Sequence, residues 1–298
     1  MGLPAIFRKA LYWADKMQWG FRTVGAWATL QGTARLGYLY LRRPKRSEVH
    51  LRSGPVLEFG YPSQVPLALL MFGDLIDPEY AFLRRISRPD WIVADVGAAI
   101  GQFTLFAATL PCAIVHSFEP SVANVVALRK NVARNGVGDR ASIHKLAFSS
   151  AEGESNFETK ASTWTSGLSR TGSEIVSVRT IADEFRRLGL SHVSVLKINV
   201  AGFEPSVLEG AESFLSKGAA DILILLLGLA SLPWYAKLAA YGYRFFYFHP
   251  GENALYEVTS FDESSILEHR PWPARHIIAV YQAAMDACIG TTISLRKL

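Results

Sequence analysis

Residues 94–105 read ADVGAAIGQFTL, and this stretch decides the fold that the sequence predicts. An apolar strand ends at Asp95, a turn with Gly97 and Gly101 follows, and a helix begins directly afterwards. Glycines in such a turn let the backbone approach a ligand closely, and the first helical turn offers free N–H groups. Dinucleotide-binding folds favour G-x-G-x-x-G here, whereas this chain has D-x-G-x-x-x-G. An acid in this place suits an ammonium group better than a pyrophosphate; the alternative for Asp95 is a helix N-cap.

A second acid, Glu119, closes the next predicted strand in the sequence SFEP. A carboxylate at this point accepts hydrogen bonds from both hydroxyls of a ribose. The alternative is an acid in a solvated turn. Because Asp95 and Glu119 end adjacent strands of an alternating pattern, together they predict a ligand that carries a ribose and an ammonium group.

Strands and helices alternate along the chain from residue 91 onward. The predicted strands cover residues 91–95, 113–118, 142–147, 193–200, 222–227, 243–249 and 276–282. Such alternation is typical of a doubly wound α/β sheet, which binds ligands at the carboxyl ends of its strands. We therefore expect an α/β domain over residues 85–298, preceded by a helical and hairpin extension over residues 1–84.

Charge is distributed unevenly over the 298 residues, whose formal net charge is +5. Residues 1–52 carry ten Lys or Arg side chains against two acids, whereas the remainder carries 21 against 24. The acidic balance of the main body does not resemble a nucleic-acid footprint, so no nucleic-acid partner is expected. Cys112 and Cys288 form neither a metal knuckle nor a disulfide framework and favour a reducing compartment. With no apolar run of membrane-spanning length and no secretory signal, we expect a cytoplasmic protein.

The basic first segment, residues 4–43, is predicted to be helical, with aromatic and aliphatic side chains between Arg and Lys residues. Two interpretations remain open. A helical cap would pack these aromatic side chains on the main domain. A peripheral membrane contact would instead place a basic, Trp-rich amphipathic segment on an anionic surface.

These features resemble S-adenosylmethionine-dependent methyltransferases, and more closely the FkbM-type family. The resemblance rests on DVGAAIGQFTL, FEPSVANVVALRKNV, LAFSSAEGE, VSVRTIADEF and LKINVAGFEPSVLEGA, which together span about half of the chain. It implies a Rossmann-like class I methyltransferase fold with a seven-stranded sheet and a reversed last hairpin. It also implies S-adenosyl-L-methionine as cofactor and methyl transfer to a hydroxyl of a small molecule, sugar or polysaccharide.

The resemblance also assigns residues to the cofactor. The cofactor-binding residues that it implies are Asp95, Gly97, Ala98, Gly101, Glu119, Pro120, Ala147, Phe148 and Asn199. Asp95 and the glycines would hold the methionine part, Glu119 would hold the ribose, and residues 147–149 would lie near the adenine.

The chain departs from the family pattern around one pocket. The family reads K-I-D-V-E-G where this chain has Asn199 and Ala201, and D-V-G-A-N-I-G where it has Ala99. Ala182 stands where the family motif T-L-D has its acid. Asn199 can orient an acceptor hydroxyl but cannot take its proton. Because carboxylates are missing here, no metal is expected.

A general base must then lie elsewhere, and two residues are candidates. Glu204 follows the strand end by one turn, where the alternative is an acid that complements the helix dipole. His249 ends the penultimate strand, where the alternative is a surface histidine. Trp164, in the polar loop ASTWTSGLS, is a candidate for contact with the acceptor or else the hydrophobic anchor of that loop.

The sequence thus predicts an S-adenosylmethionine-dependent O-methyltransferase acting on a small-molecule or glycan acceptor. The alternative is a catalytically degenerate homologue that binds S-adenosylmethionine as a binding or scaffold protein, which neutral Asn199, Ala201 and Ala182 favour. Nicotinamide-dependent oxidoreduction is weakened as a third possibility by the missing G-x-G-x-x-G motif.

Overall fold

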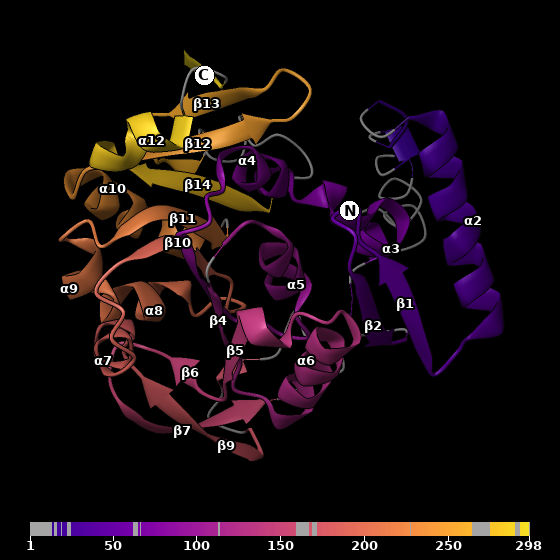
Figure 1. Cartoon of the computed structure of the whole chain (residues 1–298), viewed down its shortest axis with the longest axis horizontal. Coiled ribbons are helices and arrows are strands. Elements are labelled where there is room, and N and C mark those ends of the chain that lie inside the picture. The colour runs from indigo at the N-terminus through magenta and orange to yellow at the C-terminus, as the bar shows by residue number, and fades with distance from the viewer. Residues whose placement is uncertain are drawn as a thin grey trace, which may run out of the picture.

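The structure is a computed structural model of the whole chain (Figure 1). The residues that it describes are 14, 17–18, 20–22, 25–61, 65, 67–112, 114–158, 167–168, 172–226, 228–263, 275–289 and 293–297. Among them, no helix combines the length and the apolar character needed to cross a membrane.

A large, mostly parallel sheet forms the centre of the molecule. Its order across the sheet is β15-β13-β12-β14-β11-β10-β3-β4-β5. The strands are β3 (Ile92–Val96), β4 (Ile114–Phe118), β5 (Ala141–His144), β10 (Val193–Ile198), β11 (Ala220–Leu226), β12 (Tyr243–His249), β13 (Ala254–Val258), β14 (His276–Tyr281) and β15 (Ser294–Lys297). All six residues of β10 are buried, as expected for a central parallel strand covered on both faces.

The topology confirms the predicted doubly wound, Rossmann-like fold and refines its details. From β3 the chain runs outward through β4 to β5 and then returns to β10 on the other side of β3, which creates a topological switch point. Strand β14 runs antiparallel to its neighbours β11 and β12, and β12 also runs antiparallel to β13, so the strands at this edge of the sheet alternate in direction. Strands β13 and β15 extend the expected seven strands to nine.

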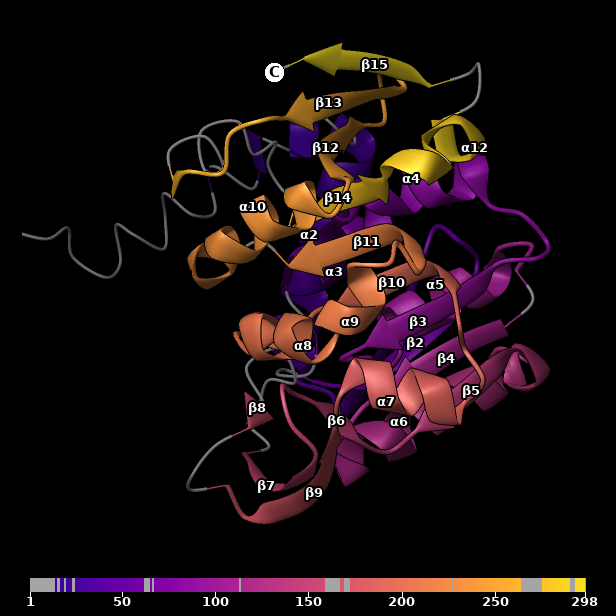
Figure 2. The ribbon, with the colours of Figure 1, turned by 90° about the vertical axis from the view of Figure 1, so that its left-hand side faces the viewer.

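Helices cover both faces of the sheet. The helices are α2 (Ala26–Arg42), α3 (Leu67–Phe72), α4 (Pro78–Ile86), α5 (Gln102–Thr109), α6 (Val122–Arg134), α7 (Ile181–Arg187), α8 (Glu204–Gly210), α9 (Glu212–Leu215), α10 (Leu232–Ala240) and α12 (Met285–Ile289), with short 3-10 turns η1 (Gly73–Ile76), η2 (Gly138–Arg140), η4 (Leu229–Ser231) and η5 (Gln282–Ala284). Helices α7 to α10 share one apolar core with the sheet and lie in front of it in Figure 2, whereas α4, α5 and α12 share a second core. A smaller sheet of β6 (Ala147–Phe148), β9 (Glu174–Arg179), β7 (Gly153–Glu158) and β8 (Gly167–Leu168) lies beside the main one.

The described part of the N-terminal extension packs on the main domain. Strands β1 (Arg46–His50) and β2 (Val56–Gly60) form the predicted hairpin. Side chains of α2, the hairpin and α3 share an apolar core with α5 and α6. Two side-chain amides, one in α6 and one at its C-cap, bind the backbone of β2: Asn131 Oδ1 accepts from the N–H of Glu58 at 2.9 Å, and Asn135 Oδ1 accepts from the N–H of Val56 at 2.8 Å. These bonds satisfy backbone groups of β2 that would otherwise be left without partners.

Candidate active site

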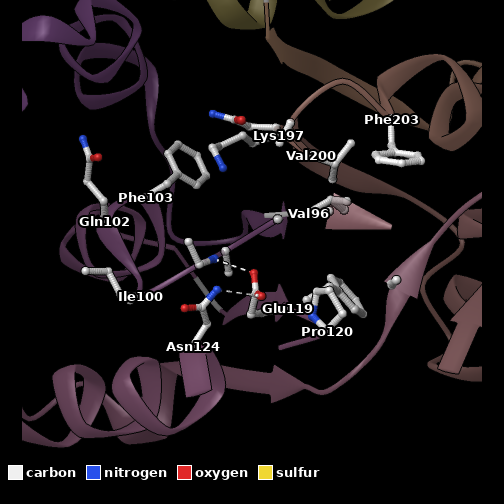
Figure 3. Close-up of a pocket in the computed structure, with 18 of the residues that line it drawn as sticks. Val96, Ile100, Gln102, Phe103, Glu119, Pro120, Asn124, Lys197, Val200 and Phe203 are labelled. Carbon is white, nitrogen blue, oxygen red and sulfur yellow. Dashed lines mark hydrogen bonds between the residues drawn. The ribbon is translucent and has the colours of Figure 1, made fainter. Parts of the chain in front are cut away.

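A cavity lies at the carboxyl ends of β3, β4 and β10, at the switch point of the sheet (Figure 3). It encloses about 990 Å³ of empty space, its open mouth included. Its wall is formed by the turn after β3, the ends of β4 and β10, the small sheet and the start of β14. Ligands of doubly wound sheets bind at this place.

The predicted turn after β3 forms the floor of the cavity. Gly97 and Gly101 have φ values of 78° and 103°, in the left-handed region that favours glycine. A Cβ atom on Gly97 would overlap with the backbone oxygen of Asn199, and one on Gly101 would overlap with Leu128. Both glycines are therefore required, one because the ends of β3 and β10 approach each other closely and the other because α5 packs on α6.

Glu119 is buried at the end of β4 and lines the cavity. Its Oε2 accepts from the N–H of Ala99 at 2.9 Å, and its Oε1 accepts from the N–H of Ser121 at 3.1 Å and from Asn124 at 3.0 Å. Figure 3 shows Asn124 directed at this carboxylate. Burial raises the pKa of the Glu119 carboxyl, and these hydrogen bonds oppose the rise. A carboxylate offers about four acceptor positions, so one position on Oε2 remains for a ligand hydroxyl.

Asp95 lies behind the cavity wall and not on it. Its Oδ1 accepts from Lys197 Nζ at 2.7 Å, and its Oδ2 accepts from the hydroxyl of Thr104 at 2.7 Å. The Asp95 side chain is fully buried and that of Lys197 is 7% exposed, so the two charges compensate each other in the core. Whether Asp95 holds an ammonium group of a ligand stays a prediction, and Lys197 already occupies one of its oxygens.

The other predicted cofactor residues lie around the same cavity. Ala98, Pro120, Ala147, Phe148 and Asn199 all belong to its wall. Ala147 and Phe148 of β6 add apolar surface to the cavity that Glu119 also lines, and an apolar surface of this kind suits a flat ring. Trp164 lies outside the described residues.

Asn199 is held by a chain of buried polar side chains. Its Nδ2 lies 3.1 Å from Nε2 of His276, at the start of β14, and Nδ1 of His276 lies 2.6 Å from Oε1 of Glu79. Because an amide NH₂ only donates, Nε2 accepts and Nδ1–H donates to Glu79. His276 and Glu79 are 3% and 1% exposed. Burial raises the pKa of Glu79 to about 7 and lowers that of His276 to about 3.

A second acid beside this chain is neutralised by an arginine. Arg275 donates to Asp77 in a bidentate ion pair, with distances of 2.7 Å from its NH2 atom to each Asp77 oxygen, and Gln102 donates to Oδ2 of Asp77 at 2.7 Å. Burial raises the pKa of Asp77, and the charge of Arg275 opposes this. Asp77, Glu79 and His276 have ligand atoms within 4.8 Å of one another. The guanidinium on Asp77 would repel a divalent cation there, so the geometry favours proton chemistry.

The two residues predicted as candidates for the general base do not line the cavity. Glu204 is buried, and its carboxylate accepts from the N–H groups of Val200 and Gly202 at 2.8 and 2.9 Å, so that it holds the turn after β10. His249 is exposed at the end of β12, where its Nδ1 accepts from the N–H of Glu252, and it is not part of the cavity wall. Neither placement supports the predicted catalytic role.

Two residues that depart from the family pattern have left-handed backbones. Ala99 and Ala201 have φ values of 49° and 55°, which cost an L-residue other than glycine or asparagine about 1 kcal/mol or more. Both line the cavity. Strain of this kind is concentrated at functional sites.

Sequence reasoning missed the chain of Glu79, His276 and Asn199. Glu79 belongs to α4, within the predicted extension, and His276 begins the last predicted strand. An acid in the first turn of α4 and a histidine at a strand start gave no signal, because only the insertion of β14 between β11 and β12 brings them together.

A sheet of this order, with a glycine turn after its first strand and an acid after its second, is that of the class I methyltransferases. The chain belongs to the methyltransferase FkbM family, whose domain matches residues 95–245, and this confirms the predicted resemblance.

The individual relatives that are similar to this chain share moderate or low sequence identity with it. The 31-O-demethyl-FK506 methyltransferase FkbM of Streptomyces tacrolimicus is 33% identical over 158 residues, which cover 42% of this chain and 61% of the relative. The chain thus spans about three fifths of that relative's length. The solved methyltransferase FkbM of Methylobacillus flagellatus is 16% identical with a TM-score of 0.46, covering 72% of this chain and 54% of its own. The solved rRNA methylase of Streptococcus thermophilus is 13% identical with a TM-score of 0.39, and the match covers 67% of this chain and 91% of the methylase.

Proposed function

We propose that the protein transfers a methyl group from S-adenosylmethionine to a hydroxyl oxygen of a small-molecule or glycan acceptor. One observation carries this proposal: the glycine turn, Glu119, Asn199 and His276 line the same cavity, and Glu79 holds His276 from behind the cavity wall. The first group fits a nucleoside cofactor, and the second fits a hydroxyl that must lose a proton.

The residues present fit the cofactor. Gly97 lets the ends of β3 and β10 meet closely in the cavity wall, Glu119 keeps one acceptor position for a ribose hydroxyl, and Phe148 offers a ring for the adenine. Bound there, S-adenosylmethionine would supply a methyl group on a sulfonium sulfur, which departs readily as a neutral thioether. The protein then has to align the acceptor and remove its proton.

Asn199 and His276 carry out these two tasks in the proposed reaction. The Asn199 amide, held by His276, orients the acceptor hydroxyl, because its oxygen accepts while its nitrogen donates. The hydroxyl then replaces that amide as donor to Nε2, and His276 takes the proton there. Because burial lowers the pKa of His276 to about 3, the proton transfer depends on the Glu79 carboxylate, which holds the opposite nitrogen and stabilises the imidazolium that forms. This resembles the orientation of a catalytic histidine by a buried carboxylate.

The competing proposal, a homologue that binds the cofactor without catalysis, rests on neutral Asn199 and Ala201. Turnover decides between the two. We would incubate the protein with S-adenosylmethionine carrying a labelled methyl group and a panel of sugars, oligosaccharides and hydroxylated macrocycles, with and without a chelator.

The proposal expects labelled product that the chelator does not abolish, and at least a 10²-fold loss in His276→Gln, the contribution expected of a general base. Cofactor binding without product across the panel supports the binding protein. Loss of product with chelator would instead assign a metal to Asp77, Glu79 and His276.

A further inference from the structure

Helix α2 has two apolar faces, and the part of the chain that the structure describes covers only one of them. Thr29, Gly32, Leu36 and Leu39 are buried against the hairpin and α3. On the opposite side Trp27, Leu30, Ala34, Tyr38 and Leu41 follow one another at spacings of three and four residues, so they form one continuous outer stripe. Figure 1 shows α2 along the outside of the molecule, beyond α3 and β1.

The outer stripe is strongly exposed. Trp27 is 73% exposed and Leu41 is 82% exposed, and Leu30 and Tyr38 are more than half exposed. Tyr40 of α2 is exposed as well, and the exposed large hydrophobic side chains on other described elements form smaller groups, such as Val122 with Val126 on α6 and Ile175 on β9. Single exposed apolar residues are ordinary, whereas a continuous apolar stripe marks a surface that binds something.

The charged side chains of α2 and of the four residues that follow it are all positive. Helix α2 contains no acidic residue. Four basic residues lie at its carboxyl end and directly after it, and all four are exposed: Arg42, Arg43, Lys45 and Arg46. Arg42 lies over the ring of Tyr38 at 5.9 Å from its centroid, so the basic group stands directly beside the stripe. A stripe of Trp, Tyr and Leu with adjacent basic side chains matches the boundary between phospholipid headgroups and acyl chains.

We propose that the outer stripe of α2 docks the protein on an anionic phospholipid surface. The aromatic and aliphatic side chains enter the headgroup boundary, and the basic cluster at the end of the helix binds lipid phosphates and carboxylates. A second copy of the chain with its α2 packed parallel to this one fits the face poorly, because the two basic clusters would lie against each other.

The test is co-sedimentation of the full chain with vesicles of phosphatidylcholine and phosphatidylserine, compared with vesicles of phosphatidylcholine alone. We expect binding to the anionic vesicles that weakens as salt is raised. The variant Trp27→Ser, Tyr38→Ser, Leu41→Ser should lose at least about tenfold in affinity, since each side chain forfeits apolar burial. The variant Arg42→Gln, Arg43→Gln should lose about fivefold for each charge.

The matched control is Val126→Ser, Ile175→Ser, which removes exposed apolar side chains from α6 and β9 and should leave vesicle binding unchanged. All substituted side chains are exposed, so each variant should keep the fold. The thermal unfolding temperature of each variant measures this. Absence of binding to anionic vesicles overturns the proposal, as does equal loss in the control. A dimer in sedimentation velocity that the stripe variant abolishes, without vesicle binding, would assign the face to a second copy.

Discussion

The Nδ2 atom of Asn199 lies 3.1 Å from Nε2 of His276, at the point where a parallel strand end and the start of the antiparallel strand β14 meet. An acid is usual in the family where Asn199 stands. Here the neutral amide is oriented by a buried histidine, whose other nitrogen is held by Glu79. The site therefore keeps a proton acceptor although the strand end itself carries no charge.

We predict that His276→Gln lowers the turnover number about 10²–10⁴-fold and leaves the affinity for S-adenosylmethionine unchanged, because the side chain acts on the acceptor. Steady-state kinetics and calorimetry measure the two quantities. The matched control is His249→Gln, which alters an exposed histidine outside the cavity and should change neither. Equal losses in both variants would remove the assignment of His276.

We predict that activity rises as pH increases through about 7, the pKa of buried Glu79. Below that pH the protonated carboxyl donates to Nδ1 of His276, which forces the imidazole proton onto Nε2 and blocks its role as acceptor. Above it, Nδ1–H donates to the carboxylate and Nε2 is able to accept. A pH–rate profile measures this, and Glu79→Gln should remove the inflection near pH 7. An inflection that persists in the variant contradicts the assignment.

We predict that Ala201→Gly raises the free energy of unfolding by about 0.5–1 kcal/mol, because relief of the left-handed strain exceeds the added backbone entropy of glycine. The companion variant is Gly97→Ala, which should lower it by about 1–3 kcal/mol, since its Cβ would overlap with the Asn199 backbone. Urea denaturation gives both values. Destabilisation by Ala201→Gly would mean that the turn conformation costs less than its φ value indicates.

We predict that Asn131→Ala lowers the free energy of unfolding by about 1–3 kcal/mol, because the amide bonds both backbone groups of Glu58 and the carbonyl of Ile100. The control is Arg134→Ala on the same helix, which removes exposed ion pairs and should cost less than about 1 kcal/mol. Similar losses of unfolding free energy in the two variants would show that the hairpin does not depend on the hydrogen bonds of Asn131.

The sequence predicted the sheet and the residues that line the cavity at the ends of β3 and β4, because both are local in the chain. The predicted strand 91–95 is β3 shifted by one residue, and the glycine turn lies directly after it. The part of the site around His276 depends on contacts between distant segments: Glu79 and His276 are 197 residues apart, and no periodicity links them. Glu204 was misleading for a different reason, because an acid in the first turn of a helix can bind either a ligand or, as here, nearby backbone N–H groups.

The sequence also did not indicate that Asp95 and Lys197 form an ion pair in the core. Lys197 and Asp95 face each other only because β3 and β10 are neighbours in register, with Lys197 opposite Asp95. A lysine in an otherwise apolar strand gave no indication of its partner. The same register explains why Asp95 is less available to a ligand than its motif suggests.

The most direct test of the proposed function is calorimetric titration of the full chain with S-adenosylmethionine, and separately with NAD. We expect binding of S-adenosylmethionine and none of NAD, and a loss of about 1.5–3 kcal/mol in Glu119→Ala, the size of a charge-assisted hydrogen bond. The control variant Glu154→Ala removes an exposed acid of β7 and should bind as the natural chain does. Absence of S-adenosylmethionine binding, or unchanged affinity in Glu119→Ala, would contradict the assignment of this cavity.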